Sequence, residues 1–417
     1  DWFDFADMRN KYDNPSNSFL YPQALWERKI SHFQTAMECG FKTNLLVTPN
    51  HVYIDQLHAK LLANTENKRF FGQLLCPSIP EAKEIILNNY RNIFTELREN
   101  GIHLDSLSGC PFDYGGCGCP ECTPWIIAFG KIFISIADIA KEFFPSIDAR
   151  LAGWWWTADE LTMFNKWADK NHPGRFKSFA SHIPYGKTKP ETPFTFPVNC
   201  DPHAFIHIVY SDAVPPDDRY GPWGPVAAPY RMESTVKDLK KEGYTGFMAY
   251  TEGLCDDVNK ALLGALSSEM ASDSHTVLTT YAERYFGAKG NTAREWAHWL
   301  SDWGKSFELS IEKSKAVFER LVIGATDSWR LRQFKAKLEL FEMHHKVMAL
   351  TDWNNERINA AQRFFKAREE FQRNVWGLGI VRHGLNQNYH QPSWYSEWAA
   401  LKKGKLQKVT EHWTAEA

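Results

Sequence analysis

The run IHLDSLSGCPFDYGGCGCPECTPW, residues 102–125, holds the features that decide the fold of this chain. Its first part, residues 103–107, alternates apolar and polar side chains and predicts a strand. From Pro124 onward an apolar helical pattern follows, so the Gly- and Cys-rich middle lies where a strand turns into a helix. In a parallel α/β protein, such a turn lies at the ligand-binding end of the sheet.

The same alternation of strand and helix continues through about the first 270 residues. Amphipathic helical segments separate most of the β-rich runs, as at residues 22–39, 80–100, 124–144 and 230–242. The eight candidate strands are residues 2–6, 43–48, 70–76, 103–107, 150–156, 176–182, 204–210 and 246–250. Eight β-α repeats favour an α/β fold of the (β/α)8 TIM barrel type over an open doubly wound sheet.

The pattern changes after about residue 272. Three long helical stretches follow, at residues 275–286, 292–322 and 329–376, and they predict an all-α C-terminal domain. We therefore expect a catalytic (β/α)8 barrel over residues 1–272 and a helical domain over residues 273–417. Trp296, Trp299 and Trp303 recur on one helical face, which favours a core stripe over a sugar platform.

Composition narrows the classes of partner. The chain has 417 residues and a formal net charge of -2, which gives no basis for binding nucleic acid or an anionic membrane. No apolar run approaches the ~20 residues of a membrane helix. Aromatic residues are abundant, with 17 Trp, 15 Tyr and 28 Phe, and such side chains suit sugars when they are not core.

The chain opens with what reads as the inside of a strand, so we expect either that a leader or domain precedes it or that the chain starts there. A periplasmic or secreted location is favoured, and no pattern indicates an oligomeric state.

Three cysteines lie in a C-x-C-x-x-C run: Cys117, Cys119 and Cys122. This spacing is too tight for three separate bridges and suits a single metal ion. Cys76 or Cys110 would supply the fourth ligand. We expect a closed, structural zinc site and no organic cofactor, since the chain lacks a Gly-rich phosphate loop. The alternatives are reduced buried cysteines, or one disulfide with a spare thiol.

Carboxylates follow several predicted strands, where barrel enzymes place catalytic groups. The candidates are Asp113, Asp159, Glu160, Asp212 and Glu252. In glycoside cleavage one carboxyl protonates the leaving oxygen, and a second acts as nucleophile or as base for water. Asp113 and Glu252 are favoured because glycines that allow close backbone approach follow both. The alternative for each candidate is a helix N-cap or a structural ion pair.

Other polar and aromatic residues at the strand ends predict a carbohydrate-binding surface. The candidate substrate-binding residues are Asp4, Arg9, Asn50, His51, Trp154, Trp156, His182, Tyr210 and Tyr250. Together with the carboxylates, they predict a glycoside hydrolase that acts on an oligo- or polysaccharide.

The cysteine run after the fourth predicted strand, with Cys76 near the end of the third, resembles the zinc knot of family 42 β-galactosidases. The resemblance covers about fifty residues and implies a (β/α)8 enzyme with its catalytic acid on strand four. That acid is a Glu preceded by Asn in the family, whereas here Asp113 follows Phe112. The longer pattern, including residues 7–11, 21–26 and 48–51, resembles a group of bacterial glycoside-hydrolase-like barrels. The layout of barrel and helices is similar to that of α-glucuronidases.

Two other functions compete with a glycoside hydrolase. A degenerate, non-catalytic barrel would bind glycans without cleaving them. A zinc-dependent hydrolase would need an open coordination position on the metal, and three or four cysteine ligands argue against that.

Overall fold

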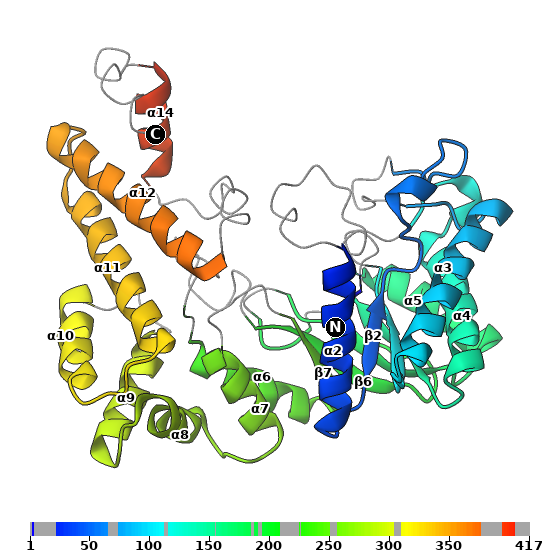
Figure 1. Cartoon of the computed structure of the whole chain (residues 1–417), viewed down its shortest axis with the longest axis horizontal. Helices are drawn as coiled ribbons and strands as arrows, with labels where there is room; N and C mark the ends of the chain where they lie inside the picture. The colour runs from blue at the N-terminus through cyan, green and yellow to red at the C-terminus, as the bar shows by residue number, and fades with distance from the viewer. Residues whose placement is uncertain are drawn as a thin grey trace. The chain divides into compact units, whose positions relative to one another are not determined.

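A computed structural model describes most of the chain (Figure 1). The described residues are 2–3, 22–65, 74–111, 116–154, 156–184, 187–190, 194–208, 225, 227–250, 257–303, 310–376 and 394–404.

The central sheet has its strands in the same order in space as along the chain. The strands are β1 (Trp2–Phe3), β2 (Asn44–Val47), β3 (Ser106–Gly109), β4 (Asp148–Gly153), β5 (Phe176–His182), β6 (Asp201–His207) and β7 (Gly246–Tyr250). All neighbouring pairs from β1 to β6 are parallel; in β2 and β3, for example, Leu46 lies opposite Ser108. Parallel neighbours require a crossover, so the segments that follow these strands leave from one edge of the sheet. The α/β class is thus confirmed, whereas an eight-stranded closed barrel stays a prediction.

The predicted strand at residues 70–76 is wrong for its described part. Leu74 and Leu75 form only isolated antiparallel bridges, to His51 and Leu62 respectively. Strand β2 pairs directly with β3, which leaves no room for a strand between them. The β-rich composition of the segment instead serves a loop that brings Cys76 to its neighbours.

Helices cover the parallel strands and begin and end at local signals in the sequence. The helices of this part are α2 (Pro22–Glu38), η2 (Ile54–Gln56), α3 (Pro80–Glu99), η3 (Pro120–Cys122), α4 (Trp125–Phe143), α5 (Ala158–Asn171) and α6 (Pro229–Lys241). Helix α3 begins with a proline, which suits the first helical turn. Helix α5 begins with a capping box, in which Thr157 and Glu160 each bind the other's backbone N–H group.

The core lies between the sheet and helices α3, α4 and α5. Phe133 of α4 is fully buried and stacks on Phe129 and Phe176, with ring centroids 6.1 Å and 6.4 Å away. A side chain at Gly109 of β3 would overlap the Phe133 ring, since an added Cβ would lie 2.7 Å from it. Only glycine therefore lets α4 approach β3 this closely.

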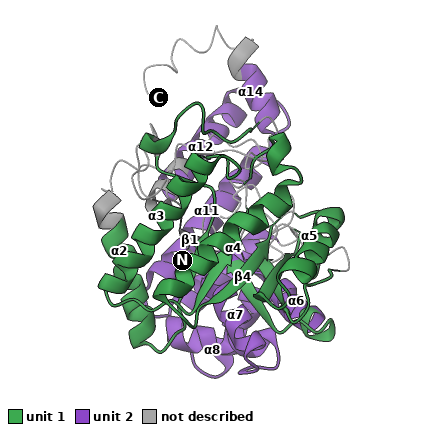
Figure 2. Ribbon diagram, turned by 90° about the vertical axis from the view of Figure 1, so that its right-hand side faces the viewer, with its two compact units in different colours: residues 1–184, 189–206, 239–249 green, residues 185–188, 207–238, 250–417 purple. Residues whose placement is uncertain are grey.

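The chain divides into two compact units (Figure 2). Unit 1 comprises residues 1–184, 189–206 and 239–249, and unit 2 comprises residues 185–188, 207–238 and 250–417. The helices that follow β7 are α7 (Asp257–Ser267), α8 (Ser274–Phe286), α9 (Asn291–Trp303), α10 (Ile311–Val322), α11 (Trp329–Ala349), α12 (Asn355–Trp376) and α14 (Tyr395–Gly404). The predicted division into a barrel over residues 1–272 and a helical domain over residues 273–417 stays a prediction.

The tryptophan stripe of α9 is core, as predicted. Trp296, Trp299 and Trp303 are each at most 4% exposed, and they pack on Phe318 of α10 and Phe334 of α11. The long helix predicted at residues 329–376 is divided into α11 and α12. The break is fixed by the Asn354 carboxamide oxygen, which accepts hydrogen bonds from the backbone N–H groups at the start of α12.

In the part of the chain that the structure describes, no helix combines the length and apolar character needed to span a membrane.

Two helical glycines test the packing of these helices. In Gly130→Ala the new Cβ would lie 2.5 Å from the Trp167 ring, so we expect a loss of about 1–3 kcal/mol in the free energy of unfolding. Gly264 of α7 has no atom within 4 Å of the added Cβ, so Gly264→Ala should gain about 0.5–1 kcal/mol from helix propensity. Urea denaturation measures both; equal effects of the two substitutions would contradict the packing.

Candidate functional site

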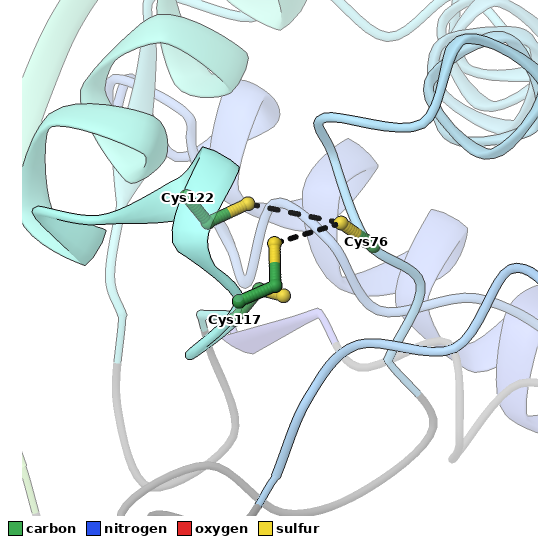
Figure 3. A group of neighbouring side chains, drawn as sticks. Cys76, Cys117 and Cys122 are labelled. Atoms are coloured by element: carbon green, nitrogen blue, oxygen red, sulfur yellow. Dashed lines mark hydrogen bonds between the residues drawn. The ribbon is translucent and has the colours of Figure 1, made fainter.

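Four cysteine side chains form one cluster, and Figure 3 labels three of them, Cys76, Cys117 and Cys122. The Sγ atoms of Cys76, Cys117, Cys119 and Cys122 all lie within 4.8 Å of one another. The Sγ atom of Cys76 is 3.7 Å from those of Cys119 and Cys122, well beyond the length of a disulfide bond. Four thiolates around a zinc ion, with Zn–S bonds of about 2.3 Å, have sulfurs about 3.8 Å apart. The geometry of the cluster therefore fits a tetrahedral metal ion.

The structure identifies the fourth cysteine of this cluster. Cys76 completes it, whereas Cys110 continues the ladder of β3, where its backbone N–H donates to Val47. Cys110 is fully buried but is not a member of the cluster.

Hydrogen bonds from two neighbouring loops hold the cluster in place. The backbone N–H of Asn64 donates to the Cys117 sulfur at 3.3 Å, and the Asn64 carbonyl accepts from Gly118. The Ser78 hydroxyl lies 2.9 Å from the Cys122 sulfur. Neither Asn64 nor Ser78 is marked by a sequence motif, so only the folded chain reveals their contribution.

The electrostatics of the cluster favour the thiolate form of Cys117 over the thiolate forms of Cys119 and Cys122. Hydrogen bonds from Cys122 and from backbone N–H groups lower the pKa of Cys117 to about 5. The adjacent Cys117 in turn raises the pKa of Cys122, and burial raises that of Cys119 to about 11. A cation at the centre of the cluster would lower the pKa values of Cys119 and Cys122, because thiolates are the form that binds metal.

A pocket of about 460 Å³ opens beside the cluster. Cys76, Ser78, Cys119 and Glu121 line it, and Cys119 is the most exposed of the four cysteines. The pocket gives a metal ion or a chelator a path to the sulfurs.

Asn50, predicted to bind substrate, is 3% exposed and lies against this cluster. Its side-chain amide donates to the carbonyls of Leu75, at 3.0 Å, and Gly116, at 2.8 Å. Its carboxamide oxygen accepts from the Gly116 N–H at 3.0 Å. Its neighbour His51 is also buried, and forms the backbone bridge to Leu74.

A second group of predicted residues lies where β4 and β5 end. The Trp154 ring lies 4.8 Å from that of His182 and 5.2 Å from that of Phe205 in β6. Burial lowers the pKa of His182 to about 4, so its imidazole is neutral at neutral pH. Phe205 is an apolar residue within β6, and no polar pattern in the sequence marks it as part of this group. Trp154 and Phe205 are buried, at 7% and 0% exposed, so at the carboxyl end of these strands it is the uncharged, half-buried His182 imidazole that is partly exposed.

Trp156 lies elsewhere. It is 7% exposed, and its ring packs on Phe129, Phe164 and Phe179 within the helix–sheet core. This placement favours a packing role for Trp156.

The carboxylates that begin α5 have different surroundings. Glu160 accepts hydrogen bonds from the Thr157 N–H, at 2.9 Å, and from the Trp125 indole, at 2.7 Å. It therefore completes the capping box of α5 and links α5 to α4. Asp159 is exposed in the first helical turn.

Tyr250 ends β7, with its ring 6.0 Å from that of His207. The other predicted residues lie outside the described part of the chain: Asp4, Arg9, Asp113, Tyr210, Asp212 and Glu252. The strands that precede them are described, and place Asp113 after β3 and Glu252 after β7 along the chain.

Comparisons with known proteins give fold-level likenesses only. No family model and no curated protein sequence matches the chain. A family 89 glycoside hydrolase from Clostridium perfringens, solved with PUGNAc, aligns with 87% of this chain at 12% identity and a TM-score of 0.47. The chain spans 50% of the length of that enzyme.

Two further solved structures are less similar. An O-GlcNAc hydrolase mutant from Thermobaculum terrenum aligns with 96% of this chain and 92% of its own, at 11% identity and a TM-score of 0.38. A sugar phosphate isomerase/epimerase from Parabacteroides distasonis aligns with 64% of this chain and 96% of its own, at 10% identity and a TM-score of 0.26. All three TM-scores are below 0.5.

The buried imidazole gives a pH-dependent prediction. Because the folded-state pKa of His182 is depressed from about 6.5 to about 4, the unfolded chain binds a proton in this interval that the folded chain does not. The contribution of the neutral His182 to the free energy of unfolding is therefore fully present above pH 6.5, and it is lost as the pH drops toward 4. Between pH 7 and pH 4, we expect the free energy of unfolding of wild type to fall by roughly 1–3 kcal/mol more than that of His182→Gln. Urea denaturation at several pH values measures the difference; parallel curves for the two proteins would contradict a neutral, buried His182.

Proposed function

We propose that this protein is a glycoside hydrolase acting on an oligo- or polysaccharide. Asp113 and Glu252 form the catalytic pair: one protonates the leaving glycosidic oxygen, and the other acts as nucleophile or as base for water. Asp159, Glu160 and Asp212 are the remaining carboxylate candidates. Of these, Glu160 has both carboxylate oxygens engaged in the contacts that cap α5.

The observation that carries the proposal is the parallel pairing of β1 to β6 in chain order. In such a sheet the segments after the strands leave from the same edge, where α/β enzymes bind their ligands. Asp113 follows β3, and Glu252 follows β7 of the same sheet.

The half-buried His182 at that edge supports a hydroxyl-bearing ligand such as a sugar. The buried rings of Trp154, which follows β4, and Phe205, in β6, pack against the His182 ring and fix its position. The His182 imidazole is uncharged and so can exchange hydrogen bonds with hydroxyl groups.

The four cysteines would hold a structural zinc ion. Four sulfurs fill a tetrahedral coordination sphere and leave no position for water or substrate, so zinc would supply folding energy and not catalysis. The same argument disfavours a zinc-dependent hydrolase. In this proposal the ion ties the segment of Cys117, Cys119 and Cys122 to the loop that carries Cys76.

Substitution of either catalytic carboxylate tests the activity. We expect Asp113→Asn and Glu252→Gln each to lower kcat about 10²- to 10⁴-fold on aryl glycosides or oligosaccharides that wild type cleaves. Glu99→Gln, at an exposed position of α3, is the control and should retain wild-type activity.

The results separate the competing functions. Full activity in both variants would remove Asp113 and Glu252 from the mechanism. Glycan binding by wild type, with no cleavage of any substrate in the panel, would instead favour the non-catalytic barrel.

Metal content tests the cysteine cluster. Purified wild type should contain about one equivalent of zinc by elemental mass spectrometry, and Cys117→Ser should contain far less. Cys39→Ser, at an exposed cysteine outside the cluster, is the matched control and should retain the metal. Wild type that neither carries zinc nor takes it up after reduction would contradict the metal site.

A further inference from the structure

Asn50 forms several hydrogen bonds to the two segments that carry the clustered cysteines, and no sequence pattern indicates them. Its side chain donates to the Leu75 carbonyl and both donates to and accepts from Gly116. Its own backbone carbonyl accepts a further bond from the Leu75 N–H, at 3.1 Å. The residue thus fixes two peptide groups that come from loops 41 residues apart.

Those two peptide groups directly precede cysteines of the cluster. Leu75 precedes Cys76, and Gly116 precedes Cys117. Gly116 has a φ of 120°, a conformation that other residues rarely adopt, so its backbone is held in a shape that only glycine readily takes. Because Asn50 bridges both segments, it sets the distance between the two cysteine-bearing loops.

The amide of Asn50 has no donor left for a substrate. A carboxamide has two N–H donors, and here both are used on backbone carbonyls at 2.8–3.0 Å. The residue is also 3% exposed, which removes it from the surface that a sugar would contact.

We propose that Asn50 is a positioning residue for the metal site, which pre-organises the four sulfurs and is not a substrate ligand. The inference rests on the proposed zinc site but not on the proposed glycosidase activity. Residues that orient metal ligands change metal affinity about 10- to 100-fold when they are replaced. Without Asn50, the ion itself would have to order the two loops when it binds. The free energy spent on this ordering would weaken metal binding.

Metal binding by the full-length protein tests the proposal. Zn²⁺ affinity is measured by competition with a chromophoric chelator, and Co²⁺ reports the site through its thiolate charge-transfer absorption. We expect Asn50→Ala to bind Zn²⁺ at least about tenfold more weakly than wild type and to show an altered Co²⁺ spectrum. Asn165→Ala is the matched control: Asn165 is also buried, and its amide donates to Thr195 in the same unit.

Each outcome decides the proposal. A loss below about tenfold in Asn50→Ala, or an equal loss in Asn165→Ala, overturns it. If Asn50→Ala does not fold, Asn50→Ser is measured against the same threshold, since its hydroxyl cannot reach both Leu75 and Gly116. If wild type does not bind Co²⁺ through thiolates, the zinc site itself is wrong. If wild type and the variant both bind metal normally, the zinc site stands and only the role of Asn50 is wrong.

Discussion

Parallel pairing of successive strands is the constraint on which the remaining structure depends. Because β1 to β6 follow one another in space as in sequence, every connection has to cross back over the sheet, and helices α3, α4 and α5 serve as such crossovers. Their apolar faces bury the sheet on the outside, with Phe133 at the centre of the aromatic core. The segments left at the carboxyl edge are then free to carry polar side chains.

That edge is reinforced where β2 and β3 end. The loops that follow these strands would otherwise be long and irregular, with few ladder hydrogen bonds of their own. Asn50 joins the two loops through hydrogen bonds, and the four cysteines join them through their clustered sulfurs. Along the chain, Asp113 lies between Gly109, the last residue of β3, and Gly116, which Asn50 binds.

Sequence reasoning succeeded where signals are local. Proline at the start of α3 and the apolar periodicity of α4 placed these helices to within about one residue, and the tryptophan spacing of α9 predicted its buried face. It failed where partners decide the outcome. Residues 70–76 have β composition, but composition does not state which strand they pair with, and Leu74 and Leu75 pair outside the sheet. The bond between Asn50 and Gly116 joins residues 66 positions apart, which no local pattern marks.

The central claim is that carboxylates after strands of one parallel sheet cooperate in glycoside cleavage. The most direct measurement is the distance between the carboxyl groups of Asp113 and Glu252 in a crystal structure with a bound sugar analogue. The account predicts about 5–5.5 Å for a retaining enzyme or about 6.5–9.5 Å for an inverting one, with the sugar between the two groups. A much larger separation, or side chains that point away from a common pocket, would contradict it.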